Sequence, residues 1–436
     1  MTGWRMMAAL AATVLAAAPA GLAAPAGPAQ PPVAPVAATP TRPPFVPCPV
    51  VAPTGPVPQR PAPPPHLPGR PVIGGEGLDT AGLTLAPGAP PLPNTLSATY
   101  WLVADLDSGA VLGACGPHEG SPPASVQKLL LCATVLPKLD PTQTVEVTQA
   151  DLDFERGSSA VGLVVGGHYT VETLWLGLLL QSGNDAAQVL ARLGGGAQGV
   201  PGTLAAMNAE AQRLGALDTH AVTPSGLDGP GQFTSAYDLA LIARADFARE
   251  DFRKYDATQR AQMPAQPPKD PRGFQIQNEN DLLVRYPGAL GGKTGFTDLA
   301  RHTYVGAAER GGRRLVVTIL GAEAHPVRAW QQGAALLDWA FSVPAGASVG
   351  HLVAPDEVDR LLHPPVPSAA PRIAPAGLGS RPAHAGSGLP LGGLAAAAGA
   401  LALVLAVVVV GVRRRRTTYR VVVEVNRSAS RSRRRP

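Results

Sequence analysis

The segment ATYWLVADLDSGAVLGA, residues 98–114, predicts a β-hairpin near the start of the apolar part of the chain. Residues Ala98–Leu106 alternate as a strand, and Asp107-Ser108-Gly109 is a turn signal. Residues Ala110–Ala114 then continue as the second arm. The hairpin predicts that the fold contains an antiparallel sheet.

Helical patterns follow this hairpin, and strands return at the end of the apolar region. The helices are expected at Ser125 to about Leu136, at Val171–Gln181 behind the N-cap Thr170, at Asp185–Leu193, and after the N-cap Ser235 with Asp238 three residues on. Strands His302–Ala308 and Leu315–Gly321 flank the turn Arg310-Gly311-Gly312, and Arg328–Phe341 is predicted as a closing helix. Strands from both ends with helices between them predict an α/β (α+β) domain over residues 94–344, with helices covering one antiparallel sheet.

The two ends of the chain predict export and anchoring. Residues 1–24 have the charged start, apolar run and small residues of a secretory signal peptide. Residues 389–412 contain no charge and are long enough, as a helix of about 36 Å, to cross a bilayer. Because four arginines follow at once, the positive-inside rule places the tail 413–436 in the cytoplasm and the domain outside.

Two proline-rich stretches connect these parts. Residues 25–93 hold 23 of the 48 prolines and almost no hydrophobic periodicity, so we expect a disordered linker there. A second linker, rich in Pro, Ala and Gly, is expected over residues 345–388.

Charge and cysteine content exclude several classes of protein. The net charge of +5 comes from the tail, which carries +9, so the remainder is acidic and gives no support to nucleic-acid binding. Cys48, Cys115 and Cys132 allow at most one intramolecular disulfide, and the residues leave its pairing open. Neither a His-Glu-x-x-His nor a Cys-x-x-Cys motif occurs, so we expect no metal and no cofactor.

Lysine is the informative residue type, because the chain has 31 arginines and only five lysines. Arginine serves for charge, whereas lysine can lose its proton and act as a base. Lys128 follows Ser125 by three residues, which places a nucleophile and a base on one helix face. Lys293-Thr294-Gly295 is a second lysine motif. It is no phosphate-binding loop, because that motif requires glycine where Pro287 stands.

Three motifs occur in the order Ser125-Val126-Gln127-Lys128, Ser182-Gly183-Asn184 and Lys293-Thr294-Gly295. In this order they resemble the motifs of penicillin-binding proteins and serine β-lactamases. The surrounding residues, with LLLQSGNDAA at 178–187 and GKTGFT at 292–297, are similar to the D-alanyl-D-alanine carboxypeptidase family in particular. The resemblance covers about residues 98–341. It implies the β-lactamase/DD-peptidase fold, a sheet flanked by helices with a mostly helical subdomain.

The resemblance also implies a mechanism. Ser125 would attack the carbonyl between two D-alanines and form an acyl-enzyme, which water then releases. Lys128 would take the serine proton, Ser182 would relay a proton to the leaving amine, and the backbone amides of Ser125 and Phe296 would hold the oxyanion. Neutral lysine at an ordinary pKa costs roughly 4.6 kcal/mol at pH 7, so burial and the nearby Lys293 must lower the pKa of Lys128.

Substrate binding is expected from the remaining motif residues. Asn184 would hold the substrate amide, and Lys293 and Thr294, followed by Gly295, would pair with the terminal carboxylate. The implied partners are the D-Ala-D-Ala end of peptidoglycan stem peptides, β-lactams that mimic it, and the cell membrane.

Two departures from the family pattern bear on function. Arg301 stands where relatives often have small residues, and we expect a surface strand residue rather than a substrate contact. About 44 residues separate Pro344 from the predicted span, which leaves no room for the β-rich domain that many relatives carry.

Three other functions stay open. They are a serine β-lactamase, a DD-endopeptidase with the same motifs, and a non-catalytic cell-wall-binding module. Rapid drug hydrolysis is not expected, because residues 219–229 lack the glutamate that activates water in the common β-lactamases.

Overall fold

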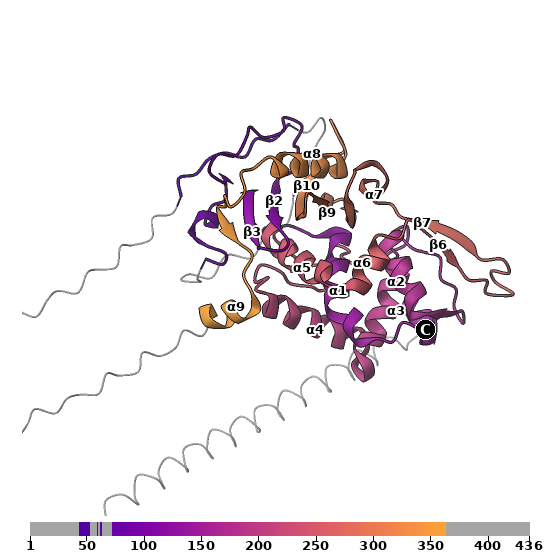
Figure 1. The fold of residues 1–436 in the computed structure, drawn as a ribbon. Helices are drawn as coiled ribbons and strands as arrows, with labels where there is room; N and C mark the ends of the chain where they lie inside the picture. Colours follow the sequence, from indigo (N-terminus) through magenta and orange to yellow (C-terminus); the bar gives the residue numbers. More distant parts are fainter. Residues whose placement is uncertain (1–42, 53–58, 60–61, 63–71, 363–436) are drawn as a thin grey trace, which may run out of the picture. The chain divides into compact units, whose positions relative to one another are not determined.

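The computed structural model describes residues 43–52, 59, 62 and 72–362 (Figure 1). The predicted signal peptide 1–24, the predicted span 389–412 and the tail 413–436 lie outside these residues. Among the residues described, no helix has both the length and the apolar character needed to cross a bilayer.

An antiparallel sheet joins strands from the two ends of the domain. Its order is β1-β3-β2-β10-β9-β8. The short β11 also pairs with β3, at Ala110 and Val111, whereas β1 pairs with residues 113–115 of the same strand. The predicted hairpins are present, and their strands β2 and β10 pair from Asp105↔Leu315 to Tyr100↔Leu320. The strands are β1 Leu83–Leu85, β2 Tyr100–Asp105, β3 Ala110–Cys115, β8 Ala289–Thr297, β9 Arg301–Arg310, β10 Arg313–Ala322 and β11 Gly350–His351. The predicted mixed fold with one such sheet is thereby confirmed.

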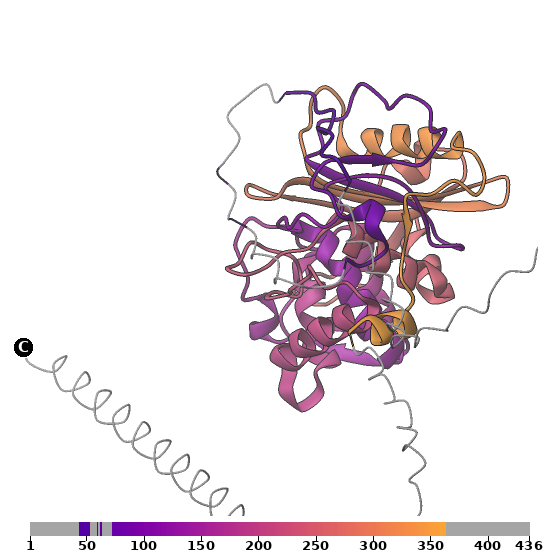
Figure 2. The same ribbon diagram turned by 90° about the vertical axis from the view of Figure 1, so that its left-hand side faces the viewer.

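Both faces of the sheet are covered by helices, as Figures 1 and 2 show. Side chains alternate along β2, so that Leu102 enters the larger core beneath the sheet and Trp101 the smaller core beneath α8. Trp101 meets Trp339 of α8 edge to face at 6.1 Å between ring centres. A sheet buried on both faces holds its strands rigidly, which fixes the backbone of β8 beside the site.

The helical subdomain lies on the face opposite α8 and supplies most of the site. Thr170 and Ser235 cap α2 and α5 as predicted, each hydroxyl accepting a hydrogen bond from the backbone amide three residues on. Residues 199–214 and 250–256 form helices that the patterns did not predict. The helices are α1 Lys128–Val135, α2 Val171–Leu180, α3 Asn184–Gly194, α4 Gly199–Leu214, α5 Ala236–Ala248, α6 Glu250–Asp256, α7 Leu282–Arg285, α8 Ala329–Phe341 and α9 Pro355–Leu362. Two small hairpins, β4 Thr144–Glu146 with β5 His168–Thr170 and β6 Arg260–Met263 with β7 Phe274–Gln277, complete it.

Residues on both sides of the predicted limits, 94 and 344, pack onto the domain. In the expected linker 25–93, β1 pairs with the sheet, and Ile73 and Leu78 are buried. In the expected linker 345–388, β11 and α9 pack onto the domain down to Leu362. β1, with the sequence Leu-Thr-Leu, is too short to show the alternation by which a strand is predicted.

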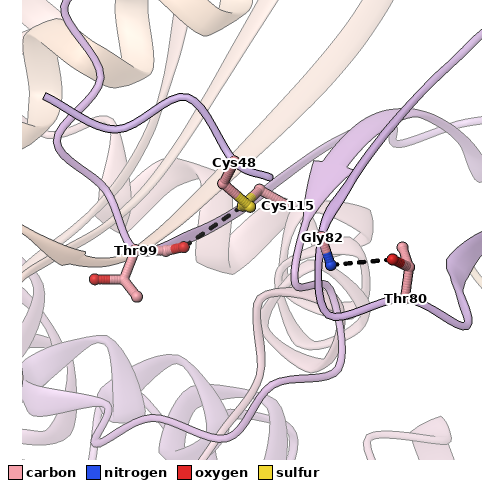
Figure 3. The surroundings of a disulfide bond; sticks show 5 residues. All are labelled: Cys48, Thr80, Gly82, Thr99 and Cys115. Carbon is pink, nitrogen blue, oxygen red and sulfur yellow. Dashed lines mark hydrogen bonds between the residues drawn. A yellow bond between two sulfur atoms is a disulfide. The ribbon is translucent and has the colours of Figure 1, made fainter. Parts of the chain in front are cut away.

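A disulfide joins Cys48 to Cys115, with 5.8 Å between the Cα atoms (Figure 3). It attaches residues 43–52 to β3, and the third cysteine, Cys132, is a buried thiol in α1. The bond closes a sequence separation of 67 residues. Its expected contribution to stability is about 4 kcal/mol through the entropy of the unfolded chain.

Candidate active site

Ser125 and Lys128 meet at the start of α1. Residues Ala124–Gln127 form a turn of 3₁₀ helix, and the α-helix begins at Lys128 rather than at the predicted Ser125. Three residues per turn place side chains i and i+3 directly above one another. Ser125 Oγ therefore lies 2.7 Å from Lys128 Nζ.

Lys128 is completely buried, and its Nζ has three oxygen partners. Besides Ser125 Oγ, Nζ lies 2.8 Å from Asn184 Oδ1 and 2.9 Å from the carbonyl oxygen of Ser225. A neutral amine has two N–H donors and one lone pair. An ammonium could donate to all three oxygens. In the neutral amine the two carbonyl oxygens take the two donors, and the lone pair is left for the serine hydroxyl.

The electrostatics of the site favour the neutral amine. Burial lowers the pKa of Lys128 well below its usual range, and the positive charge of Lys293 lowers this pKa further. Neutral Lys128 can accept the proton of Ser125 without first losing one of its own.

Ser182 and Asn184 lie at the junction of α2 and α3. Ser182 has φ +57°, a strained conformation for a residue with a side chain, and it projects into the same pocket as Ser125. Within the described residues, its buried Oγ finds no hydrogen-bond partner. Asn184 has both ends of its amide engaged, Oδ1 by Lys128 and Nδ2 by Ser158 Oγ at 2.9 Å. The amide thus holds the lysine, and a substrate would have to displace Ser158 to reach it.

Strand β8 carries the third motif past the nucleophile. A Cβ atom on Gly295 would lie 2.8 Å from the backbone nitrogen of Ser125, so only glycine allows this approach. Phe296 is the next residue, which brings the two expected oxyanion donors to one place. Lys293 is buried, and its Nζ donates to the carbonyl of Thr294 at 2.9 Å. Burial lowers the pKa of Lys293 to about 8, against the opposing negative charges of Glu279 and Asp256.

These motifs line a pocket of about 620 Å³. Its wall includes Ser125, Ser182, Asn184, Thr294, Gly295 and Phe296, while Lys128 and Lys293 lie buried behind it. The structure therefore brings the predicted catalytic and binding residues of the three motifs together at one site.

The pocket also contains residues that the sequence did not single out. Ser158 and Ser159 come from the loop before α2, Glu279 from the segment after β7, and Arg328 from the residue before α8. Both Glu279 and Arg328 are exposed to solvent. Each residue lies in a loop without a motif, and only the tertiary fold brings it to the pocket.

Arg301 is engaged within the protein. Its guanidinium makes two hydrogen bonds to the carboxylate of Glu323, at 3.0 and 2.9 Å, and lies 5.5 Å from the ring centre of Phe296. It does not belong to the wall of the pocket described above.

One group in the described part of the chain has the composition of a metal site, namely His118, Asp218 and Asp238. The two ring nitrogens of His118 each lie 3.1 Å from an oxygen, one of Asp218 and one of the Ile73 carbonyl. Both ring nitrogens thus face oxygen atoms of the protein itself. The group instead ties residue 73 to the domain.

The fold and the three motifs define a serine DD-peptidase, and comparison with known proteins identifies the family. Residues 86–324 match the model of the D-alanyl-D-alanine carboxypeptidase family. The chain belongs to this family of serine-type carboxypeptidases, as the motifs predicted.

Individual relatives agree with this assignment. The chain is 48% identical over 271 residues to the D-alanyl-D-alanine carboxypeptidase DacB2 of Mycobacterium tuberculosis, a match that covers 61% of this chain and 89% of the relative. A crystal structure of a D-alanyl-D-alanine carboxypeptidase from M. tuberculosis H37Rv superposes with a TM-score of 0.58 at 45% identity, covering 62% of this chain and all of that one. The crystal structure of the Streptomyces K15 DD-transpeptidase superposes with a TM-score of 0.55 at 27% identity, covering 58% of this chain and 100% of that one. The chain spans 60% of the length of DacF from Bacillus subtilis, to which it is 30% identical.

Proposed function

We propose that this protein is exported, anchored in the cell membrane by residues 389–412, and removes the terminal D-alanine from peptidoglycan stem peptides through an acyl-enzyme on Ser125. One observation carries the chemical part of the proposal: a fully buried lysine whose Nζ lies 2.7 Å from the hydroxyl oxygen of Ser125. Nucleophilic catalysis by serine requires such a base within hydrogen-bond reach.

Acylation follows from this geometry. Ser125 Oγ bonds to the carbonyl carbon between the two D-alanines while its proton passes to Lys128 Nζ. The carbonyl oxygen becomes an oxyanion, which the backbone amides of Ser125 and Phe296 stabilise by hydrogen bonds. Asn184 keeps the lysine amine aimed at the serine through the bond to Oδ1.

Breakdown of the tetrahedral intermediate needs a proton on the leaving nitrogen. Ser182 Oγ is buried in the pocket wall without a protein partner in the described region, so it can pass the proton from Lys128 to the amine of D-alanine. The C–N bond then breaks and D-alanine leaves. Water then attacks the carbonyl carbon of the ester, and its proton passes to Lys128 Nζ. The bond from this carbon to Ser125 Oγ breaks, Oγ takes the proton back from Lys128, and the shortened peptide leaves with a free carboxyl group.

The terminal carboxylate of the substrate needs an accessible cation. Lys293 is buried and bonded to a backbone carbonyl, so we assign direct contact to Thr294 and the exposed Arg328. The charge of Lys293 acts from behind the wall, where it lowers the pKa of Lys128. This division revises the expectation that Lys293 itself pairs with the carboxylate.

Export and anchoring rest on the sequence of the two ends. The features in their support are the signal pattern in residues 1–24, the uncharged stretch 389–412 and the arginines that follow it. The tail 413–436 would then be cytoplasmic and the catalytic domain extracellular, close to its peptidoglycan substrate.

A β-lactamase is the second candidate, because the structure places Glu279 in the pocket although residues 219–229 contain no glutamate. A carboxylate beside an acyl-serine can activate water and shorten the life of a penicillin adduct. The two functions therefore differ in how long that adduct persists.

The test uses the full chain and its Ser125→Ala variant, each incubated with diacetyl-Lys-D-Ala-D-Ala and with a fluorescent penicillin. D-alanine release and a long-lived adduct by intact mass, both absent from the variant, are the expected results. An adduct that clears within minutes without peptide turnover would instead identify a β-lactamase. Absence of both signals would leave only wall binding.

A further inference from the structure

A buried carboxylate contacts the backbone of the third motif from behind. Asp256 is the last residue of α6 and has no exposed surface. Its Oδ2 accepts a hydrogen bond of 2.6 Å from the amide of Gly292, the residue before Lys293. Of the described residues, none bonds to the other oxygen, Oδ1.

The backbone of β8 is shaped around this carboxylate. Gly291 and Gly292 have φ near +140°, which residues with side chains rarely adopt, and the pairing with β9 shifts register just before them. A Cβ atom on Gly291 would lie 2.1 Å from Asp256 Oδ2. The strand thus departs from regular pairing at the position where Asp256 takes one of its amides.

Asp256 also interacts with the charge of the neighbouring lysine. Its negative charge raises the pKa of Lys293, against the effect of burial, and Lys293 in turn lowers the pKa of Asp256. The other titratable groups that interact with this cluster are Glu279, Asp246 of α5, Cys132 of α1 and Tyr304 of β9.

We propose that Asp256 is a positioning residue for catalysis, which holds the Gly291–Gly292 backbone and keeps Lys293 protonated behind the nucleophile. The inference rests on the proposed acylation of Ser125. It adds a residue from α6, far from the three motifs in sequence, whose charge sets the pH range over which the site works.

The direction of the pH effect follows from the two pKa values. Burial raises the pKa of Asp256 to about 7, so the carboxylate is charged above that pH. Lys293 loses its proton above about pH 8, and the positive field that favours the anionic transition state is lost with it. Without the charge of Asp256, Lys293 would lose its proton at a lower pH.

The decisive variant is Asp256→Asn, which keeps an acceptor for the Gly292 amide and removes the charge. The measurement is the second-order rate constant for acylation of the full chain by a fluorescent penicillin between pH 6 and 10. In the wild type this rate constant should fall at high pH, and we call this fall the alkaline limb of the pH profile. In the variant we expect the alkaline limb to lie about one pH unit lower. The variant should fold, because Asp256 is itself neutral in the wild type below about pH 7.

Asp246→Asn is the matched control. Asp246 is also buried, and within the described residues neither of its carboxylate oxygens has a hydrogen-bond partner. Burial, and then the charge of Asp256, raise the pKa of Asp246 well above its usual range, which favours the neutral acid. Asparagine then replaces one neutral group by another, and the alkaline limb should stay in place. Asp256→Glu restores the charge and should return the limb toward the wild-type pH.

The outcomes separate this inference from the proposed function. A folded Asp256→Asn protein with an unmoved limb overturns the inference, as does an equal shift in Asp246→Asn. A wild-type chain that forms no adduct overturns the proposed function instead.

Discussion

Replacement of Lys128 tests the centre of the proposed mechanism, because two substitutions separate its charge from its basicity. Lys128→Arg keeps N–H donors for Asn184 Oδ1 and the Ser225 carbonyl, but arginine does not give up its proton in a protein. Lys128→Met keeps the approximate volume and loses both donors and base. We expect both variants to lose acylation, and the arginine variant to lose more stability, because it keeps a second buried charge near Lys293.

The size of each effect can be worked from the contacts. General-base catalysis contributes about 10²- to 10⁴-fold, so acylation should fall by at least two orders of magnitude in both variants. Lys128→Met leaves two buried acceptors without donors, at about 1–3 kcal/mol each. It also removes an amine whose burial is unfavourable, so the net loss should lie near the lower end of that sum.

The assay combines the acylation rate with a fluorescent penicillin and the free energy of unfolding in urea at pH 7.5. Because the pKa of Lys128 is lower in the folded than in the unfolded protein, the unfolded chain binds the additional proton. Wild-type stability should therefore rise with pH in the window below 10.5, and the methionine variant should lack this contribution. A Lys128→Arg enzyme that acylates within tenfold of wild type would refute the role of Lys128 as the base.

Three further outcomes follow from single contacts. Arg328→Gln should raise KM for the D-Ala-D-Ala peptide by about tenfold or more, because a charge-assisted hydrogen bond to the substrate carboxylate is lost, with a smaller change in stability. The control is Arg285→Gln, at an exposed residue of α7. An equal rise in KM in both variants would argue against a specific contact by Arg328. Ser158→Ala should slow acylation by roughly three- to tenfold, because Asn184 Nδ2 loses its acceptor and the Asn184 amide then orients Lys128 less well. An unchanged rate would show that the bond between Asn184 Oδ1 and Lys128 is enough to fix this amide. Cys48→Ser should lower the free energy of unfolding by about 4 kcal/mol, which lowers Tm by on the order of 10 °C. Reductant should lower the Tm of the wild type to that of the variant. A wild-type Tm that does not respond to reductant would contradict this.

Sequence patterns predicted those parts of the fold in which local signals and tertiary structure agree. The hairpin at residues 98–114 has alternation and a turn, and the helix after Thr170 has a cap. By contrast, α4 begins with Gly-Val-Pro-Gly, which reads as a loop, and β1 is three residues long and pairs only because β3 is already in place. Short edge elements depend on the sheet that they join, so the chain alone does not reveal them.

The candidate site divides in the same way. Ser125, Ser182 and Lys293 belong to motifs whose order in the chain was visible. The roles proposed for Arg328, just before α8, and for Asp256, at the end of α6, depend on where the fold places these residues. No sequence motif marks either of them. Residues that support a site from other elements are found only when the packing between those elements is known.

Lysine usage connects the sequence with the chemistry of the pocket. Lys138, Lys254 and Lys269 are exposed, and Lys128 and Lys293 are the two cations that are buried within the described residues. Burying two ammonium groups near one another is unfavourable unless one of them gives up its proton, and arginine at either position would keep both charges. The same repulsion that would destabilise an ordinary core here lowers the pKa of Lys128 and leaves its lone pair for Ser125. Glu279 and then Asp256 raise the pKa of Lys293, and Asp256 acts on Lys293 but not on Lys128, so its charge favours Lys293 as the lysine that stays protonated.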